Sequence, residues 1–247
     1  MRNTLTLCGR ELASYFLSPL AYITITVFLI VTGLNFWKLS VESLGGSIPF
    51  ATLLFGPALF WIMLLVVITV ITMRLFAEEK RNGTIELLMT APVRDTEVVM
   101  GKFLAAILFL VAACAPTAAY PLVLRALSTG VAELDHGQMA TGYVGLALIA
   151  AFYVSIGLFV SSLTKSQVVA AMLTFAVLCT VFFIEHFHYM IPGRAAAQPV
   201  VDYVSTVQQV LDFSRGILDT RAVVLYVSGT VYMLFATVKI MESRRWM

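Results

Sequence analysis

The feature that most constrains the fold of this chain is a series of six apolar runs, each long enough to cross a bilayer. A helix needs roughly 20 residues to cross a hydrocarbon core about 30 Å thick. The runs lack the alternating pattern of barrel strands, so helices are the expected spanning elements. We therefore predict an all-α polytopic membrane protein with a single transmembrane domain over residues 1–247. The predicted spans are 18–37, 52–73, 98–121, 141–163, 167–187 and 222–240.

The composition agrees with this class of protein. The chain is 60% hydrophobic and 12% charged, with a mean hydropathy of +0.92, whereas soluble domains carry about 25% charged residues. A net charge of +2 is too small to indicate a nucleic-acid partner. The three cysteines are an odd number without CxxC spacing, which argues against a disulfide framework or a zinc site.

The basic residues predict which ends of the spans face the cytoplasm, because Lys and Arg accumulate in cytoplasmic loops. They are concentrated between spans two and three, before span one, between spans four and five, and after span six. The residues on this side are Arg2, Arg10, Arg74, Lys80, Arg81, Arg94, Lys102, Lys165, Lys239, Arg244 and Arg245. We therefore expect both termini to be cytoplasmic.

The longest charged interruption of the apolar sequence lies between spans two and three. Asn82 and Gly83 break the helix of span two there. Thr84 can cap a new short helix with Glu86 in its first turn, and Pro92 ends it. A helix of about two turns is not stable alone in water, so its apolar face needs a surface. That surface is the membrane or the same subunit in one interpretation, and a soluble partner in the other.

We predict that segment 78–92 is a cytoplasmic coupling segment that docks onto a soluble partner. Ile85, Leu88 and Met89 share one face at helical spacing, which gives the segment an apolar docking surface. The candidate contact residues are Glu78, Glu79, Arg81, Asn82, Gly83, Thr84, Ile85, Glu86, Leu87 and Leu88.

Two further segments are predicted to be amphipathic helices that do not span the membrane. Residues 3–16 predict a connecting helix in the membrane interface, which Pro19 ends; the alternative is a polar N-terminus that leads directly into span one. Its apolar face contains Leu5, Cys8, Leu12 and Phe16, with Asn3, Arg10 and Ser14 opposite.

The outer loop 190–221 is too long for a structureless connection and predicts the second amphipathic helix, with Gly216 at its end or at a bend. The polar residues Asp202, Gln208, Gln209 and Asp212 are expected to face away from its apolar side. We predict that the apolar side forms an outer gate or contacts an outer-face partner. Its residues are Val200, Tyr203, Val204, Val207, Val210 and Leu211.

Within the spans, prolines predict kinks and small residues predict close helix packing. The prolines are Pro57, Pro116 and Pro121, and the small residues of span four are Gly142, Gly145, Ala147, Ala150, Ala151, Gly157, Ser161 and Ser162. Whether span four packs within one subunit or between two is left open by the residues.

No catalytic or metal site is predicted. Gly101-Lys102 is followed by Phe103, so the phosphate-binding G-x-x-x-x-G-K-[ST] pattern is absent. His186 and His188, next to Glu185, would point to different sides of a helix, which favours an interfacial polar cap over a metal site.

The run from Phe76 to Val93, FAEEKRNGTIELLMTAPV, followed by Lys102, resembles the signature of ABC-2 type permeases. It is most similar to the short permeases related to the gliding-motility and nitrous-oxide-reductase-maturation transporters. The segment from Phe213 to Asp219 and the ending from Glu242 to Trp246 are also similar to that group. The resemblance covers the whole chain in span count and loop order.

The resemblance implies a permease subunit of an ABC transporter in a bacterial-type inner (cytoplasmic) membrane. It implies an N-terminal connecting helix, a coupling helix between spans two and three and outer-leaflet helices between spans five and six. It also implies a separate cytoplasmic ATPase that binds ATP and Mg, and a second permease copy or a related permease. An outer-face accessory protein is a further expected partner. This chain would need no cofactor of its own.

The alternative function is a non-ABC membrane scaffold or a secondary transporter. A secondary transporter normally carries carboxylates or histidines within its spans, and these spans contain almost none at mid-depth. The apolar spans suit a hydrophobic or amphipathic substrate, or a machine that transmits force to an outer-face partner. The sequence does not decide between substrate transport and force transmission.

Overall fold

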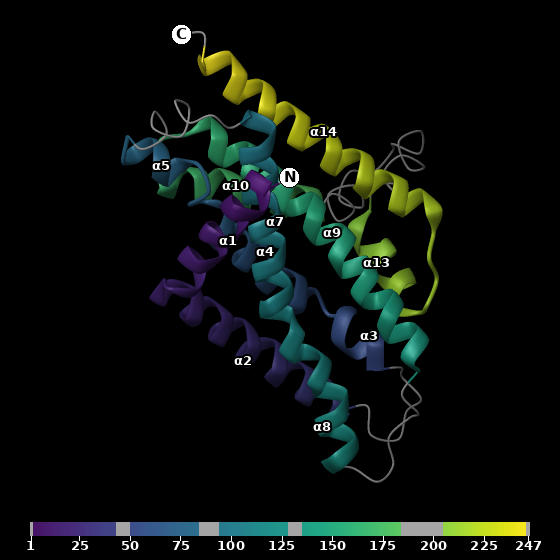
Figure 1. Cartoon of the computed structure of the whole chain (residues 1–247). Coiled ribbons are helices and arrows are strands. Elements are labelled where there is room, and N and C mark those ends of the chain that lie inside the picture. Colours follow the sequence, from purple (N-terminus) through teal and green to yellow (C-terminus); the bar gives the residue numbers. More distant parts are fainter. Residues whose placement is uncertain (1, 43–49, 84–93, 128–134, 184–204, 246–247) are drawn as a thin grey trace.

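A computed structural model describes residues 2–42, 50–83, 94–127, 135–183 and 205–245 (Figure 1). Within these residues every element is a helix. The elements are α1 (Arg2–Phe16), α2 (Pro19–Glu42), α3 (Phe50–Phe55), α4 (Ala58–Thr72), α5 (Ala77–Arg81), α7 (Asp95–Cys114), η1 (Ala115–Ala119), α8 (Tyr120–Leu127), α9 (His136–Leu163), α10 (Gln167–Phe182), α13 (Thr206–Ser214) and α14 (Thr220–Arg245).

The predicted all-helical, multi-pass architecture is confirmed. Five stretches of the described residues are long and apolar enough to cross a membrane: Pro19–Glu42, Ala58–Arg81, Asp95–Val123, His136–Leu163 and Thr220–Ser243. The predicted span 167–187 corresponds to α10, which is shorter in the described residues, and positions 184–187 lie outside them. The sixth span therefore stays a prediction.

The predicted second span is divided near its start. Gly56 and Pro57 separate α3 from α4, because Pro57 cannot donate a backbone hydrogen bond. One backbone carbonyl that the break leaves without a helical partner is bound by Trp61, whose Nε1 donates to the Phe55 oxygen at 2.6 Å. The predicted kink at Pro116 also occurs, as the 3₁₀ turn η1 between α7 and α8.

Helix α9 packs against three other elements of the same chain through its glycines. A Cβ added at these glycines would overlap a neighbour within the same chain. The contacts are Gly142 with Phe55 of α3, Gly145 with Phe213 of α13, and Gly157 with Thr72 of α4, each at 2.4 Å. The three glycines of α9 therefore serve close packing within one subunit.

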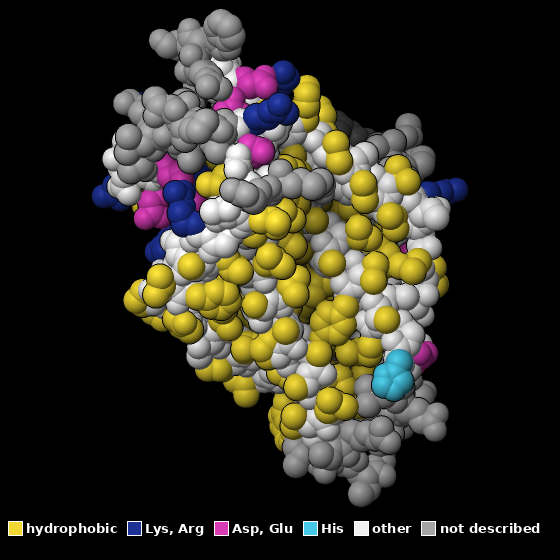
Figure 2. Space-filling model, viewed as in Figure 1, with side chains coloured by type: hydrophobic (Ala, Val, Ile, Leu, Met, Phe, Trp, Pro, Cys, Tyr) yellow, Lys and Arg dark blue, Asp and Glu magenta, His cyan; other side chains and the backbone are white. Residues whose placement is uncertain are grey.

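Apolar side chains cover the middle of the molecule, and charged side chains gather in the upper part of the same view (Figure 2). Helices α2 and α14 expose much of their apolar surface, including Ile30, Leu34, Val224 and Val231. Such exposure suits a bilayer, where lipid chains surround outer helices. The charged end holds α5 and the start of α7, and it is where the candidate site lies.

Candidate functional site: the junction beneath the coupling segment

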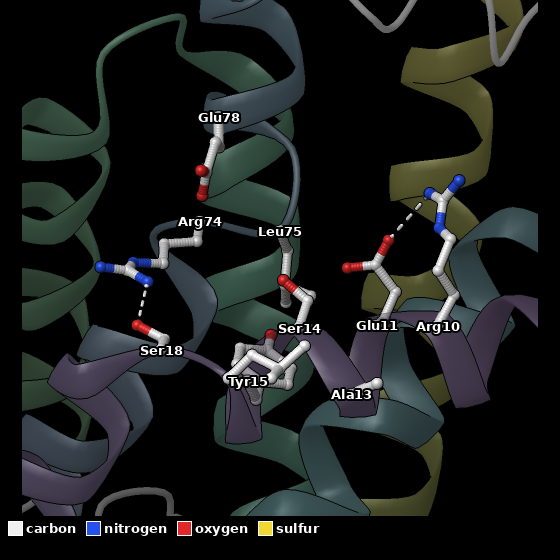
Figure 3. Close-up of a pocket in the computed structure, with 10 residues that line it drawn as sticks. Arg10, Glu11, Ala13, Ser14, Tyr15, Ser18, Arg74, Leu75 and Glu78 are labelled. Atoms are coloured by element: carbon white, nitrogen blue, oxygen red, sulfur yellow. Dashed lines mark hydrogen bonds and ion pairs between the residues drawn. The ribbon is translucent and has the colours of Figure 1, made fainter.

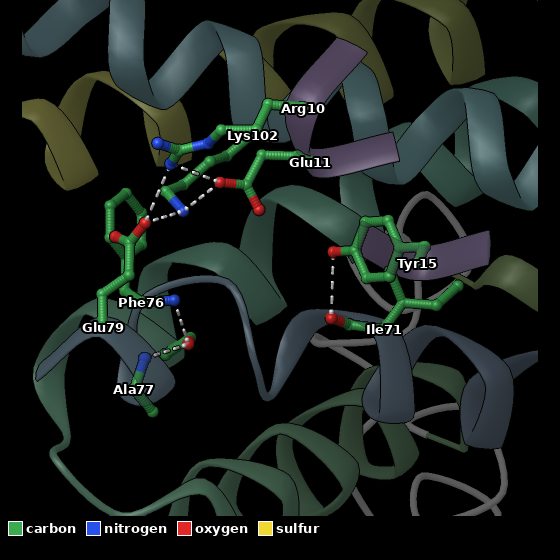
Figure 4. Close-up of polar contacts among 9 residues, drawn as sticks. Arg10, Glu11, Tyr15, Ile71, Phe76, Ala77, Glu79 and Lys102 are labelled. Carbon is green, nitrogen blue, oxygen red and sulfur yellow. Dashed lines mark hydrogen bonds and ion pairs between the residues drawn. The ribbon is translucent and has the colours of Figure 1, made fainter. Parts of the chain in front are cut away.

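A buried lysine organises the charged end of the molecule. Lys102, near the start of α7, is only 2% exposed. Its Nζ lies 2.7 Å from Glu79 Oε1 and 3.1 Å from Glu11 Oε1, and 5.3 Å from the centre of the Phe76 ring. A buried ammonium group needs such partners because its desolvation is costly. Lys102 therefore joins three elements, α1, α5 and α7 (Figure 4).

Arg10 completes this group, which we call the charged junction: Arg10, Glu11, Glu79 and Lys102. Its Nη2 lies 3.2 Å from Glu11 Oε1 and 3.7 Å from Glu79 Oε1. The two cations and two carboxylates balance in charge. Arg10 is largely exposed, so its contribution is screened by solvent, whereas the bonds of Lys102 are protected.

The end of span two is interrupted at residues 73–76, which we call the span-two break. The Leu75 N–H donates to the Thr72 oxygen at 3.2 Å, a tighter pattern than that of an α-helix. The Ile71 carbonyl is instead bound by the Tyr15 hydroxyl of α1 at 3.2 Å. Burial raises the pKa of Tyr15 well above its ordinary value, so this hydroxyl stays protonated and donates.

Ser161 of α9 holds the other side of the break. Its Oγ accepts from the N–H groups of Phe76 and Ala77 at 3.1 and 3.2 Å, and it donates to the Met73 oxygen at 3.4 Å. These N–H groups begin α5 and have no partner within that helix. Lys80 of α5 also donates to the Ser162 carbonyl oxygen. Helix α5 is thus fixed to α9 at both of its ends.

Only part of the predicted coupling segment is described. Glu78 and Glu79 are half-buried and Arg81 is exposed, on α5. Asn82 caps the end of α5 and Gly83 follows with φ +70°, which confirms the predicted helix end. Thr84, Ile85, Glu86, Leu87 and Leu88 lie outside the described residues, and so does the rest of the predicted short helix.

The structure gives Glu79 an internal partner that sequence reasoning did not assign. Its carboxylate binds Lys102, so it anchors α5 to α7. Lys102 is a lone charge inside an apolar run and Glu11 is a lone carboxylate on α1. That combination was the available signal for a buried ion pair. Ser161 and Tyr15 gave no comparable signal.

The N-terminal helix is present over its predicted length, but its apolar residues divide between two faces. Cys8 is buried, whereas Leu5 is 68% exposed and Phe16 is 37% exposed. Tyr15, which the predicted face omitted, is buried too. Contact with α7 creates the second face, because one side of α1 packs on α7 and the other is left exposed.

The predicted outer helix is described from Thr206 onward as α13. Val210 is buried, Val207 and Leu211 are half-buried, and Gln208 is exposed. The Tyr153 hydroxyl of α9 donates to Thr206 Oγ1 at 3.1 Å. Gln209 and Asp212, expected to face away, are half-buried. Val200, Tyr203 and Val204 lie outside the described residues, as does Asp202.

The end of α13 follows the sequence expectation for Gly216. This residue has φ +89°, and the Ile217 N–H donates to the Asp212 oxygen at 2.9 Å, which closes the helix end.

Among the described residues no group of three or more His, Cys, Asp or Glu could hold a metal ion. Glu185, His186 and His188 lie outside those residues.

Replacing Ser161 should loosen the span-two break. Ser161→Ala leaves two buried N–H groups without an acceptor, and each costs about 1–3 kcal/mol. We expect a lower midpoint of thermal unfolding for the detergent-solubilised protein. Ser162→Ala is the matched control, because Ser162 Oγ is equally buried but bonds only the Phe159 carbonyl of its own helix. Equal midpoints for the two variants would contradict the assigned role of Ser161.

Comparison with known proteins gives the family of this chain. A comparison with curated proteins finds no match. A family model described as an ABC-2 family transporter protein matches residues 53–238. The match includes the span-two break, α7 and α9, and it covers most of the 247 residues. This chain therefore belongs to the ABC-2 family of transporter proteins and is a multi-pass membrane permease component of an ABC transporter.

Proposed function

We propose that this chain couples ATP hydrolysis by a separate cytoplasmic ATPase to export, or to force transmission, across the inner membrane. The observation that carries the proposal is the anchoring of α5. This short helix leads into the coupling segment 78–92. Buried groups bond it to α7 and α9, and Lys102 of α7 links it further to Glu11 of α1. A push on the coupling segment would therefore move several helices together.

The driving ATPase is expected in a partner chain. This sequence contains no phosphate-binding loop, and its Gly101-Lys102 pair is not available for one. Lys102 is buried and bonded to two carboxylates of the same chain, so its ammonium cannot bind a nucleotide phosphate without breaking the charged junction. ATP and Mg would bind only to the partner ATPase.

The proposed assembly contains two permease chains and two ATPase subunits. ATPase closure would move the coupling segments, and the permease pair would rock between two states, each favoured by its own set of contacts. An outer-face accessory protein would contact the surface around α13.

The apolar groove between α7 and α9, about 410 Å³ in volume, supports a hydrophobic or amphipathic cargo. It is lined by Leu110, Cys114, Tyr143 and Ala147, among others.

Charge on the docking face should weaken association with the ATPase. Leu88→Asp introduces a carboxylate at an apolar contact, with an expected loss of about 2–4 kcal/mol. Gly83→Pro should disturb the segment's start, because proline fixes φ near −65° and Gly83 has φ +70°. Co-purification with the ATPase and stimulated ATP hydrolysis measure both effects.

The control is Lys165→Asp, which adds a carboxylate at an exposed position between α9 and α10. It should leave association unchanged. If Leu88→Asp and Gly83→Pro both assemble with the ATPase and stimulate it like the wild type, segment 78–92 is not the coupling element.

The orientation can be tested by thiol labelling of intact cells. In a background without Cys8, Cys114 and Cys179, a cysteine at Asn82 should be protected from a membrane-impermeant reagent, and one at Gln208 should react. Both positions are exposed in the structure, so burial does not explain protection. Labelling at Asn82 from outside would overturn the cytoplasmic placement of the termini and coupling segment.

The outer helix should affect transport without affecting ATPase association. Val204→Asp and Val207→Asp place charge on the predicted apolar face and should reduce transport or outer-partner binding. Gln208→Ala changes an exposed polar side chain and should be near neutral. Transport is measured beside co-purification with the ATPase. Equal effects of the three variants would refute the face assignment, and loss of the ATPase with Val207→Asp would indicate a role in folding.

A further inference from the structure

A polar pocket lies between α1 and the span-two break, beside the charged junction (Figure 3). Its volume is about 440 Å³. Besides Tyr15, the side chains that give the pocket its polar lining are Arg10, Glu11, Ser14, Ser18, Arg74 and Glu78. What this pocket binds can be inferred from the charges that remain unused in it.

Arg74 is the unused cation of this pocket. Its Nη1 donates to Ser18 Oγ at 2.8 Å, but its Nε is buried and has no acceptor among the described residues. No carboxylate within those residues forms an ion pair with it. A guanidinium group presents its N–H donors as a planar fork that matches the oxygens of a phosphate. The Nε itself is closed to the pocket, so an anion there would meet the guanidinium group at its Nη nitrogens, of which Nη1 already donates to Ser18.

Glu78 is the unused anion of the same pocket. It projects from α5 into the pocket above Arg74 (Figure 3), and within the described residues it has no ion-pair partner. Arg10 and Glu11, at the other wall, already neutralise each other at 3.2 Å. The pocket thus offers one cation and one carboxylate side by side. A ligand that carries both a phosphate and an ammonium group would satisfy both.

The position of the pocket indicates that such a ligand comes from the bilayer. The pocket lies where α1 meets the start of α2, since Leu17 and Ser18 line it together with charged residues of α1 and α5. Leu17 lines it and is 83% exposed, and neighbouring Phe16 also exposes part of its ring. Apolar side chains at the rim of a polar pocket suit a molecule with a charged head and hydrocarbon chains.

We propose that this pocket binds the phosphoethanolamine headgroup of a membrane phospholipid. The Arg74 fork would bind the phosphate, Glu78 would accept from the primary ammonium group, and the acyl chains would lie along Leu17. A quaternary ammonium group has no N–H to donate, so a phosphocholine headgroup fits less well. An anionic glycerol headgroup offers Glu78 only neutral hydroxyl donors and no positive charge, so it also fits less well. The bound lipid would fix α1 to the span-two break, independently of the ATPase.

Native mass spectrometry of the purified full-length chain tests this proposal without the ATPase. The protein is incubated with equal amounts of phosphatidylethanolamine, phosphatidylcholine and phosphatidylglycerol that have identical acyl chains, and retained lipids are counted by mass. We expect a preference for phosphatidylethanolamine of about tenfold, as one charge-assisted hydrogen bond supplies. Equal retention of the three lipids would overturn the proposal.

The variants separate the two charges. Arg74→Gln should lower retention of all phospholipids about tenfold, whereas Glu78→Gln should remove only the preference for phosphatidylethanolamine. Lys165→Gln is the matched control, since it removes an exposed cation outside the pocket. Wild-type retention and selectivity in both pocket variants would refute the site. If Arg74→Gln does not fold, the wild-type preference and Glu78→Gln decide the question.

Soluble competitors distinguish a lipid from a free phosphate compound. Phosphoethanolamine and inorganic phosphate are added separately, each in excess over lipid. A lipid site should keep its phosphatidylethanolamine, because the acyl chains contribute to binding along Leu17. Displacement by either compound under these conditions would assign the pocket to a water-soluble ligand and would overturn the lipid proposal.

Discussion

The structure depends on how the backbone is satisfied where span two is interrupted. A membrane offers no water to unpaired N–H and C=O groups, so a break in a span survives only where protein supplies partners. Here Tyr15 of α1 binds the Ile71 carbonyl and Ser161 of α9 binds the N–H groups of Phe76 and Ala77. The break between α4 and α5 is therefore stabilised by two helices that are far apart in the sequence, α1 and α9.

The charged junction adds a second restraint on the same short helix. Lys102 is buried between Glu11 and Glu79, and separating a buried ammonium group from its carboxylates is strongly destabilising. Helix α5 therefore cannot swing freely relative to α1 and α7. In the proposed coupling, a force applied at its exposed end would move the junction as a unit, as rigid-body switching requires.

Helix α9 connects the two ends of the molecule. Near one end, Gly157 allows Thr72 to approach and Ser161 holds the break. Near the other, Gly145 contacts Phe213 of α13. The proposed coupling element and the proposed outer helix are thus in contact with one continuous helix. A tilt of α9 is the simplest motion by which a change at α5 would reach α13.

The sequence alone determined the fold class, most of the spans, the break at Gly83 and the end at Gly216. Hydrophobic length and glycine or proline chemistry are local, and they are readable from neighbouring residues. Only the tertiary structure decided which residues meet across the chain. Lys102 with Glu11 and Glu79, Ser161 with the span-two break, and the two-faced α1 all depend on helix packing. No local pattern encodes these pairings, because the partners are separated by whole spans.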